Sequence, residues 1–196
     1  MTYQAPVKDM LFVLNHLAGL PQVAALPGFE EATPDTTQAV LEESARYAGD
    51  VLAPLNHAAD REPSAWRDGA VTTSPGFKEA FRLYADAGWQ GMTQPVEYGG
   101  QGLPGLLGAP CSEMLNAANL SFALCPLLTN GAVEALLTAG SPELRERFIG
   151  PMLSGRWTGT MNLTEPQAGS DLALLRSRAQ PVGDGTYRIS GTKIFI

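Results

Sequence analysis

Residues 157–171 read WTGTMNLTEPQAGSD, and the two halves of this stretch follow different physical rules. In the first half, apolar or small residues alternate with polar ones up to Glu165, a period of two that is typical of a β-strand. Pro166 has no N–H to give to a strand ladder, and Gly169 permits a tight turn or the close approach of a ligand. The sequence therefore predicts a strand that ends at Glu165 and a loop after it.

The loop contains three small residues, Ala168, Gly169 and Ser170, which offer backbone N–H groups and a hydroxyl. Backbone donors of this kind hold anionic phosphates in glycine-rich turns. The preceding strand would supply a flat wall beside the anion. A wall next to an anion cradle suits a dinucleotide that carries a planar ring system.

Two stretches of this sequence carry a resemblance to a known family. TEPQAGSD, followed by a hairpin that leads to ISGTKIFI at residues 189–196, resembles the flavin-binding segment of the acyl-CoA dehydrogenases, whose usual form is C-x-T-E-P-x-A-G-S-D. Residues 95–103, PVEYGGQGL, resemble the P-x-x-Y-G-G-x-G-L stretch of the same family's helical N-terminal domain. Residues 1–9, MTYQAPVKD, resemble the N-terminal extension of a subgroup of larger members.

The resemblance implies a mainly α fold with β: an N-terminal helical domain followed by the opening strands of a β-barrel-like middle domain. It implies an FAD-dependent oxidoreductase of fatty acid metabolism that dehydrogenates acyl-CoA thioesters to 2,3-enoyl-CoA. A carboxylate base would remove the α-proton while the β-hydrogen leaves as hydride to the flavin. That base, a Glu, belongs to a C-terminal helical domain that this sequence lacks, so we assign no catalytic residue. The implied partners are an electron-transferring flavoprotein as acceptor and further copies in a homo-oligomer.

Cofactor and substrate residues follow from the same resemblance, position by position. Thr164 is the leading candidate because its hydroxyl can bond the flavin ring edge, although a cross-strand Thr would look the same. Ser170 and Gly169 match the phosphate-binding end of the motif, and Ser170 also approaches the CoA part of the substrate in relatives; a simple loop cap is the alternative. The expected cofactor residues are Met161, Leu163, Thr164, Gly169, Ser170 and Phe195, and the expected substrate residues are Ser170, Tyr98 and Gly99.

Several of these residues have a plainer interpretation. Phe195 stands where relatives often carry Trp against the flavin, yet it could be a core aromatic. Tyr98 and Gly99 could belong to an ordinary glycine turn. Glu165 adjoins the expected site, but its position favours a structural carboxylate held by backbone donors over a catalytic base. Asp171 is expected to cap a short turn.

Composition narrows the function further. The net charge of −7, from 20 acidic and 13 basic residues, disfavours a nucleic acid partner. The sequence shows no apolar run of eighteen residues, no secretory signal and no metal-ligand spacing, so we expect a cytoplasmic protein without an integral membrane segment or a metal. Cys111 and Cys125 are expected to be buried free thiols.

The hydrophobic period and the positions of proline and glycine divide the chain at two places. Residues 1–32 form an extension with a helix around Met10, residues 33–155 form a helical domain, and the period changes from about 3.6 to 2 near Arg156. Within the helical domain, Thr33 and Ser141 are expected N-caps, Pro54 should kink or end a helix, and residues 62–73 should be a polar connection. Helices are expected over residues 106–118, over 126–138, and from Ser141 to Gly150.

In the remaining residues, 156–196, a hairpin around GDG at 183–185 leads to a further strand from Lys193. Because the sequence stops inside that strand, we expect a truncated polypeptide, inactive alone. The alternatives are a noncatalytic helical interaction domain with a vestigial flavin loop, or an acyl-CoA oxidase-type relative.

Overall fold

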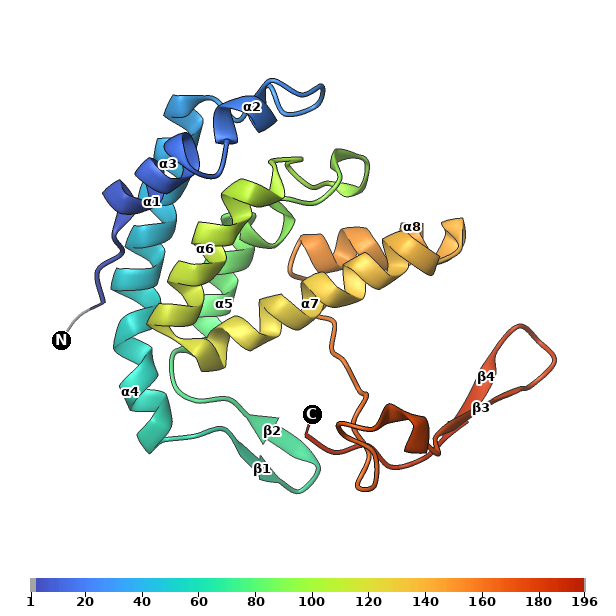
Figure 1. The fold of residues 1–196 in the computed structure, drawn as a ribbon. Coiled ribbons are helices and arrows are strands. Elements are labelled where there is room, and N and C mark those ends of the chain that lie inside the picture. The colour runs from blue at the N-terminus through green and yellow to red at the C-terminus, as the bar shows by residue number, and fades with distance from the viewer. Residues whose placement is uncertain (1–2, 196) are drawn as a thin grey trace. The chain divides into compact units, whose positions relative to one another are not determined.

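The structure is a computed structural model that describes residues 3–195. Its contacts divide the chain into two compact units, Met1–Gly159 and Thr160–Ile196, with residues 1, 2 and 196 outside the description. The first unit is helical, and the second contains a short hairpin and loops (Figure 1). This is the mainly α fold with some β that the sequence predicts.

The helical unit begins with two helices that lie within residues 1–32. They are α1, Val7–His16, and α2, Leu20–Ala24. Met10, Leu14 and Leu20 are buried and belong to the main hydrophobic cluster, so the extension contributes to the core. The assignment of residues 1–32 as a region of their own stays a prediction.

A long helical run follows, made of α3, Pro34–Arg46, the π-helical segment η1, Tyr47–Leu52, and α4, Ala53–Arg61. The predicted N-cap is confirmed, since the Thr33 hydroxyl accepts from the Thr36 N–H at 3.1 Å. The helical run does not end at Pro54 but continues to Arg61. Just before Pro54 the helical hydrogen bonds span five residues instead of four, since the Ala53 N–H donates to the Ala48 carbonyl. This π-helical turn accommodates the proline, which has no N–H of its own.

A hairpin and three further helical pieces lead to the middle of the unit. They are β1, Ala65–Arg67; β2, Ala70–Thr72; α5, Phe77–Asp86; and the 3₁₀ turns η2, Trp89–Gly91, and η3, Val96–Tyr98. The hairpin corrects the expectation of a plain polar connection. Asp68 and Gly69 both have positive φ, as a two-residue Asp-Gly hairpin turn requires, so the signal was present in the sequence.

Three helices complete the unit: α6, Gly105–Ala118; α7, Leu120–Ala139; and α8, Pro142–Leu153. Contrary to expectation, α7 begins six residues before Pro126, because Asn119 caps it by accepting from the Phe122 N–H at 3.1 Å. Ser141 caps α8 as predicted. That helix continues past Pro151 because Met152 and Leu153 are buried in a hydrophobic cluster.

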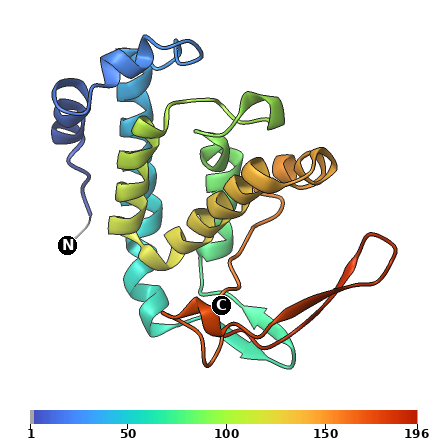
Figure 2. The same cartoon turned by 45° about the vertical axis from the view of Figure 1, so that its right-hand side comes forward.

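The core of the helical unit lies where α6 packs against α3 and α7. Figure 2 shows α6 lying along α3, and α7 leaving the end of α6 toward α8. Leu41, Leu52, Leu107 and Met114 have no exposed surface, and a group of aromatic rings surrounds Phe122. A second cluster joins α7 to α8 through Val133 and Ile149.

The second unit contains the turn η4, Leu172–Leu174, and the antiparallel strands β3, Arg178–Pro181, and β4, Tyr187–Ser190. The register pairs Arg178 with Ser190 and Pro181 with Tyr187, so the predicted hairpin around GDG is confirmed. Two other predicted strands are absent among the described residues. Residues 157–164 and 193–195 have no ladder, because their described bonds are separate ones: the Trp157 N–H donates to the Pro151 carbonyl, the Gly159 N–H to the Thr129 hydroxyl, and the Ile194 N–H to the Thr164 carbonyl. Ile196, the last residue of the second predicted strand, lies outside the described residues.

Candidate functional site

Glu165 lies at the centre of the bonding in the second unit. Its Oε1 accepts from the Lys193 ammonium at 2.9 Å and from the Ser177 N–H at 3.0 Å. Its Oε2 accepts from the Gln167 amide at 2.6 Å and from the Arg176 N–H at 2.8 Å. The side chain is 3% exposed. The prediction of a structural carboxylate held by backbone donors is therefore confirmed.

The electrostatics of this group follow from its donors. The bond from Lys193 first, and then those from Ser177 and Arg176, hold the pKa of the Glu165 carboxyl well below its ordinary value. Two bonds on each oxygen fill the usual acceptor positions of a carboxylate. Glu165 is thus an ionised group with no lone pair directed at a substrate, which excludes it as a general base in this arrangement.

The residues around Lys193 lie beside the start of the TEPQAGSD segment, Thr164, and the residue before it, Leu163. The Lys193 Nζ donates to the Leu163 carbonyl at 3.0 Å, and the Ile194 N–H donates to the Thr164 carbonyl at 2.9 Å. A turn then follows, in which Glu165 and Ala168 exchange backbone bonds of 2.9 and 3.0 Å. The bonds from Lys193 and Ile194 use the backbone carbonyls of Leu163 and Thr164, so the side chains of these two residues remain available.

The predicted cofactor residues lie on the open surface of this unit. Met161 is 59% exposed and Phe195 90% exposed, Leu163 is exposed, and Thr164 is half-buried. Phe195 is exposed in this unit, and its role against a flavin or as a core aromatic stays a prediction. Apolar side chains this exposed are available for contact with a planar ring.

The loop after Glu165 also has room for a ligand. A Cβ atom at Gly169 would meet only the Thr164 Cγ2, at 3.7 Å, so the space over this glycine is open. Ser170 is exposed and directly precedes Asp171, whose carboxylate caps η4 by accepting from the Ala173 N–H at 3.0 Å. The cap predicted for Asp171 is confirmed, and the residues present fit a phosphate-bearing planar cofactor.

Tyr98 and Gly99 belong to the helical unit, where Tyr98 is the last residue of η3 and Gly99 follows it. Tyr98 packs against the cluster of Val133 and Ile149, and Gly99 has a φ of 90°. At Gly100 a Cβ atom would overlap the Gln94 carbonyl, so only glycine fits there. The structure explains these residues as a tight turn, and their role toward a substrate stays a prediction.

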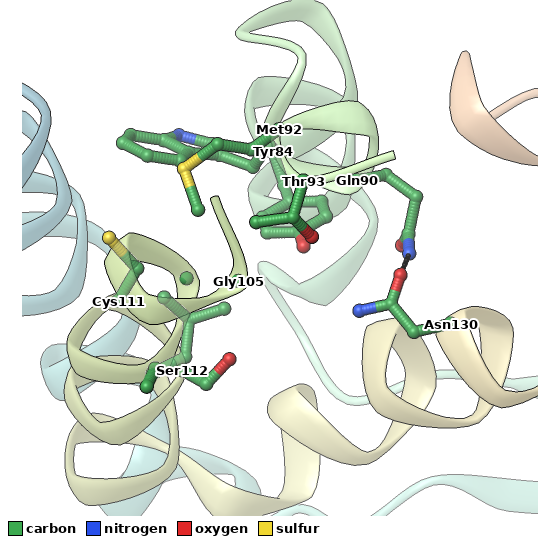
Figure 3. Close-up of a pocket in the computed structure, with 12 residues that line it drawn as sticks. Tyr84, Gln90, Met92, Thr93, Gly105, Cys111, Ser112 and Asn130 are labelled. Carbon is green, nitrogen blue, oxygen red and sulfur yellow. Dashed lines mark hydrogen bonds between the residues drawn. The ribbon is translucent and has the colours of Figure 1, made fainter. Parts of the chain in front are cut away.

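The helical unit contains a pocket of about 260 Å³ between η2, α6 and α7, which sequence reasoning did not identify (Figure 3). The amide of Gln90 donates to the Asn130 side chain at 2.6 Å on one side of it. Cys111, a free thiol on another side, is buried, which raises its pKa to about 11. Polar but uncharged side chains dominate the lining, and none of the predicted site residues is among them. Cys111 is therefore the buried free thiol that was predicted, whereas Cys125 is half-buried.

Helix α7 carries a row of exposed leucines, Leu120, Leu124 and Leu127, on the face away from Phe122 and Val133. By length and composition it is the helix, among residues 3–195, that could cross a membrane. It packs on α6 and α8, as the core helix of a globular unit would. The expectation of a protein without a membrane segment stays a prediction.

Two contributors to the site were missed by sequence reasoning. The sequence predicts no separate role for Lys193 or Gln167, yet both donate to Glu165. A buried carboxylate needs a cation or several donors, and Lys193 and Gln167 supply part of this need at Glu165. In the described part of the chain, no group of three His, Cys, Asp or Glu residues could hold a metal ion.

Comparison with known proteins identifies the class. The model of the acyl-CoA dehydrogenase N-terminal domain matches residues 34–156, and this chain belongs to the acyl-CoA dehydrogenase family. It is 50% identical over all 196 residues to 3-methylmercaptopropionyl-CoA dehydrogenase of Ruegeria pomeroyi, of which it covers 33%. That protein represents the subgroup to which residues 1–9 pointed.

Solved structures agree with this fold. The chain matches butyryl-CoA dehydrogenase from Megasphaera elsdenii with a TM-score of 0.70 and 26% identity, over 83% of this chain and 41% of that one. It matches an acyl-CoA dehydrogenase complexed with FAD from Bacillus anthracis with a TM-score of 0.68 and 20% identity, over 83% of this chain and 26% of that one. The chain thus spans about a third of the length of its curated relative.

Proposed function

We propose that this chain is the N-terminal part of an FAD-dependent acyl-CoA dehydrogenase that converts acyl-CoA thioesters to 2,3-enoyl-CoA. One observation carries the proposal: the Glu165 carboxylate and its four donors fix the TEPQAGSD segment and leave Thr164, Gly169 and the preceding Leu163 accessible. Membership of the family supports it.

Each accessible residue has a definite task in this proposal. Met161, Leu163 and Phe195 form the apolar wall for the flavin ring, and the Thr164 hydroxyl donates to the ring edge. Gly169 and Ser170 hold phosphate groups, with Ser170 also near the CoA moiety, while Tyr98 and Gly99 shape the substrate side. The FAD would supply the acceptor for the hydride that leaves the β-carbon.

The base for the α-proton lies outside this chain in the proposal. Two acidic residues lie beside the site: the two oxygens of Glu165 are already occupied by four donors, and the carboxylate of Asp171 caps η4. The chain's own residues therefore bind and orient, and proton removal belongs to another part of the complete gene product. The isolated chain should not turn over acyl-CoA.

The substrate and partners are proposed from the relatives. The 50% identity to 3-methylmercaptopropionyl-CoA dehydrogenase makes a short thioether acyl-CoA the first substrate to assay. An electron-transferring flavoprotein is the proposed acceptor, and a cytoplasmic homo-oligomer is the proposed form.

The test is Thr164→Val in the complete gene product, including any coding sequence that follows Ile196. We expect the wild type to purify yellow with FAD, and the variant to bind FAD with an altered absorption spectrum. Loss of one hydrogen bond of about 1 kcal/mol would shift a two-electron potential by about 20 mV. Thr72→Val, in the exposed hairpin of the helical unit, is the matched control and should change neither property.

A colourless wild-type protein that takes up no FAD on reconstitution would overturn the proposal and favour the noncatalytic interaction domain. Uptake of FAD with transfer of electrons directly to oxygen, rather than to a flavoprotein acceptor, would favour an oxidase-type relative.

A further inference from the structure

Lys193 is the second residue around which the cofactor segment is organised. Its ammonium has three protons, and two of them are used, on Glu165 at 2.9 Å and on the Leu163 carbonyl at 3.0 Å. The Lys193 side chain is 22% exposed. One side chain therefore joins the buried carboxylate to the backbone of a predicted flavin-contact residue.

The neighbouring bond extends this attachment by one residue. The Ile194 N–H donates to the Thr164 carbonyl at 2.9 Å, so residues 193 and 194 hold residues 163 and 164 in order. The two segments form no strand ladder, and these two bonds set their relative position. Because a side chain provides one of them, its removal leaves the pair of segments joined by the Ile194 bond alone.

Glu165 fixes the other end of Lys193. Three of the four donors to Glu165 come from residues 11, 12 and 28 positions further along the chain, Arg176, Ser177 and Lys193. A carboxylate tied to two backbone N–H groups cannot follow a moving lysine, so the ammonium is held at one point. The position of that ammonium sets the Leu163 carbonyl and, through the peptide unit, the direction of the Thr164 side chain.

From this geometry we infer that Glu165 and Lys193 act as positioning residues that hold Leu163 and Thr164 at the orientation in which they meet the flavin ring. The inference rests on the proposed function and adds two residues that touch no cofactor themselves. Removing the Glu165–Lys193 ion pair would keep Leu163 and Thr164 but change their orientation relative to the flavin ring.

The experiment compares Lys193→Met and Glu165→Gln with the wild type in the complete gene product. FAD affinity is measured by titration of the apoprotein, and the absorption spectrum is recorded at saturating FAD. Since each variant removes a charge-assisted bond, we expect FAD affinity to fall by about tenfold to a hundredfold in both. We expect the saturated spectrum to shift as well, because the ring then meets a displaced Thr164.

Two further variants separate positioning from general stability. Lys193→Arg keeps a cation and should restore most of the affinity and the wild-type spectrum. Lys78→Met removes an exposed lysine of the helical unit and should leave both unchanged. If Lys193→Met fails to fold by circular dichroism, the affinity and spectrum of Lys193→Arg and Lys193→Gln decide the matter by the same criteria.

Hydrogen exchange at the Arg176 and Ser177 amides, which donate to Glu165, measures whether the Glu165–Lys193 pair is intact in the absence of the cofactor. Faster exchange together with wild-type FAD affinity and spectrum would show that the pair is merely structural and overturn the inference. If the wild type itself binds no FAD, both the proposed function and this inference are wrong. If the wild type binds FAD and the variants bind it equally well with the same spectrum, only this inference is wrong.

Discussion

Gly100 is a residue whose replacement should be costly for steric reasons alone. A methyl group there would overlap the Gln94 carbonyl, which is backbone and cannot rotate away. We expect Gly100→Ala to lower the free energy of unfolding by about 2 to 3 kcal/mol, as overpacking does. Gly105→Ala is the matched control, because a Cβ atom at Gly105 would have no neighbour within 4 Å. Thermal melts of both variants check this, and equal melting temperatures would contradict it.

The Glu165 carboxyl predicts a particular response to acid. Its folded-state pKa is depressed, mainly by Lys193, so the stability it contributes is present above the ordinary carboxyl pKa and is lost as the pH falls through the lowered value. We therefore expect protection of the Arg176 and Ser177 amides to persist below pH about 4.3, the ordinary value for Glu. Hydrogen exchange from pH 7 to 3, referenced to the Ile189 amide of β4, measures it. Loss of protection centred at the ordinary value would show that the donors do not hold the carboxylate.

Among the elements, α3 begins at a cap whose contribution can be measured. The Thr33 hydroxyl accepts from the Thr36 N–H at 3.1 Å, and Pro34 occupies the first helical position. Thr33→Ala should therefore destabilise the helical unit by about 1 kcal/mol. Thr33→Ser retains the oxygen and should recover most of this loss in chemical denaturation. If Ser were no better than Ala, the cap would not be the cause.

Element boundaries show where sequence reasoning succeeded and where it failed. Caps such as Thr33 and Ser141 were predictable, because an N-cap is a local interaction between residues three apart. Prolines gave wrong boundaries. A helix was expected to begin at Pro126 and another to end before Pro151, but both prolines lie inside helices, which tertiary packing stabilises beyond them. Local sequence cannot report burial supplied by a distant helix.

The site divides in the same way. The alternation in residues 157–165 indicated correctly that the segment is not helical. A strand also requires a partner with repeated ladder bonds, and the described residues supply only separate bonds and one bridge. Glu165 was predictable as a structural carboxylate from its motif position. Its ion pair with Lys193 was not, because the two residues are 28 positions apart and no periodicity connects them.

At the scale of the molecule, the helical unit should fold without the residues that follow it. Both hydrophobic clusters of the helical unit end by Leu153, and the Gly159 N–H closes the unit by donating to the Thr129 hydroxyl at 3.1 Å. A chain ended after Thr160 should keep the melting temperature that the helical signal of residues 1–196 shows. A chain ended after Pro151 is the matched control and should melt lower, since it lacks Met152 and Leu153. Circular dichroism at 222 nm follows both, and a lower melting temperature for the first chain would contradict the expectation.

The β3–β4 hairpin has a practical use that follows from how it is attached. Its ends are fixed close together: Ser177 and Lys193 bond the same oxygen of Glu165, and Gly191 lies so near Ser177 that a Cβ atom there would overlap the Ser177 hydroxyl. Between these points, residues 178–190 are exposed along their whole length. Exposed hairpin tips anchored in this way tolerate inserted sequence. The turn at Gly183 and Gly185 is therefore the place to install an epitope or a fluorophore for following this protein, since an insertion there lengthens a loop whose base does not move.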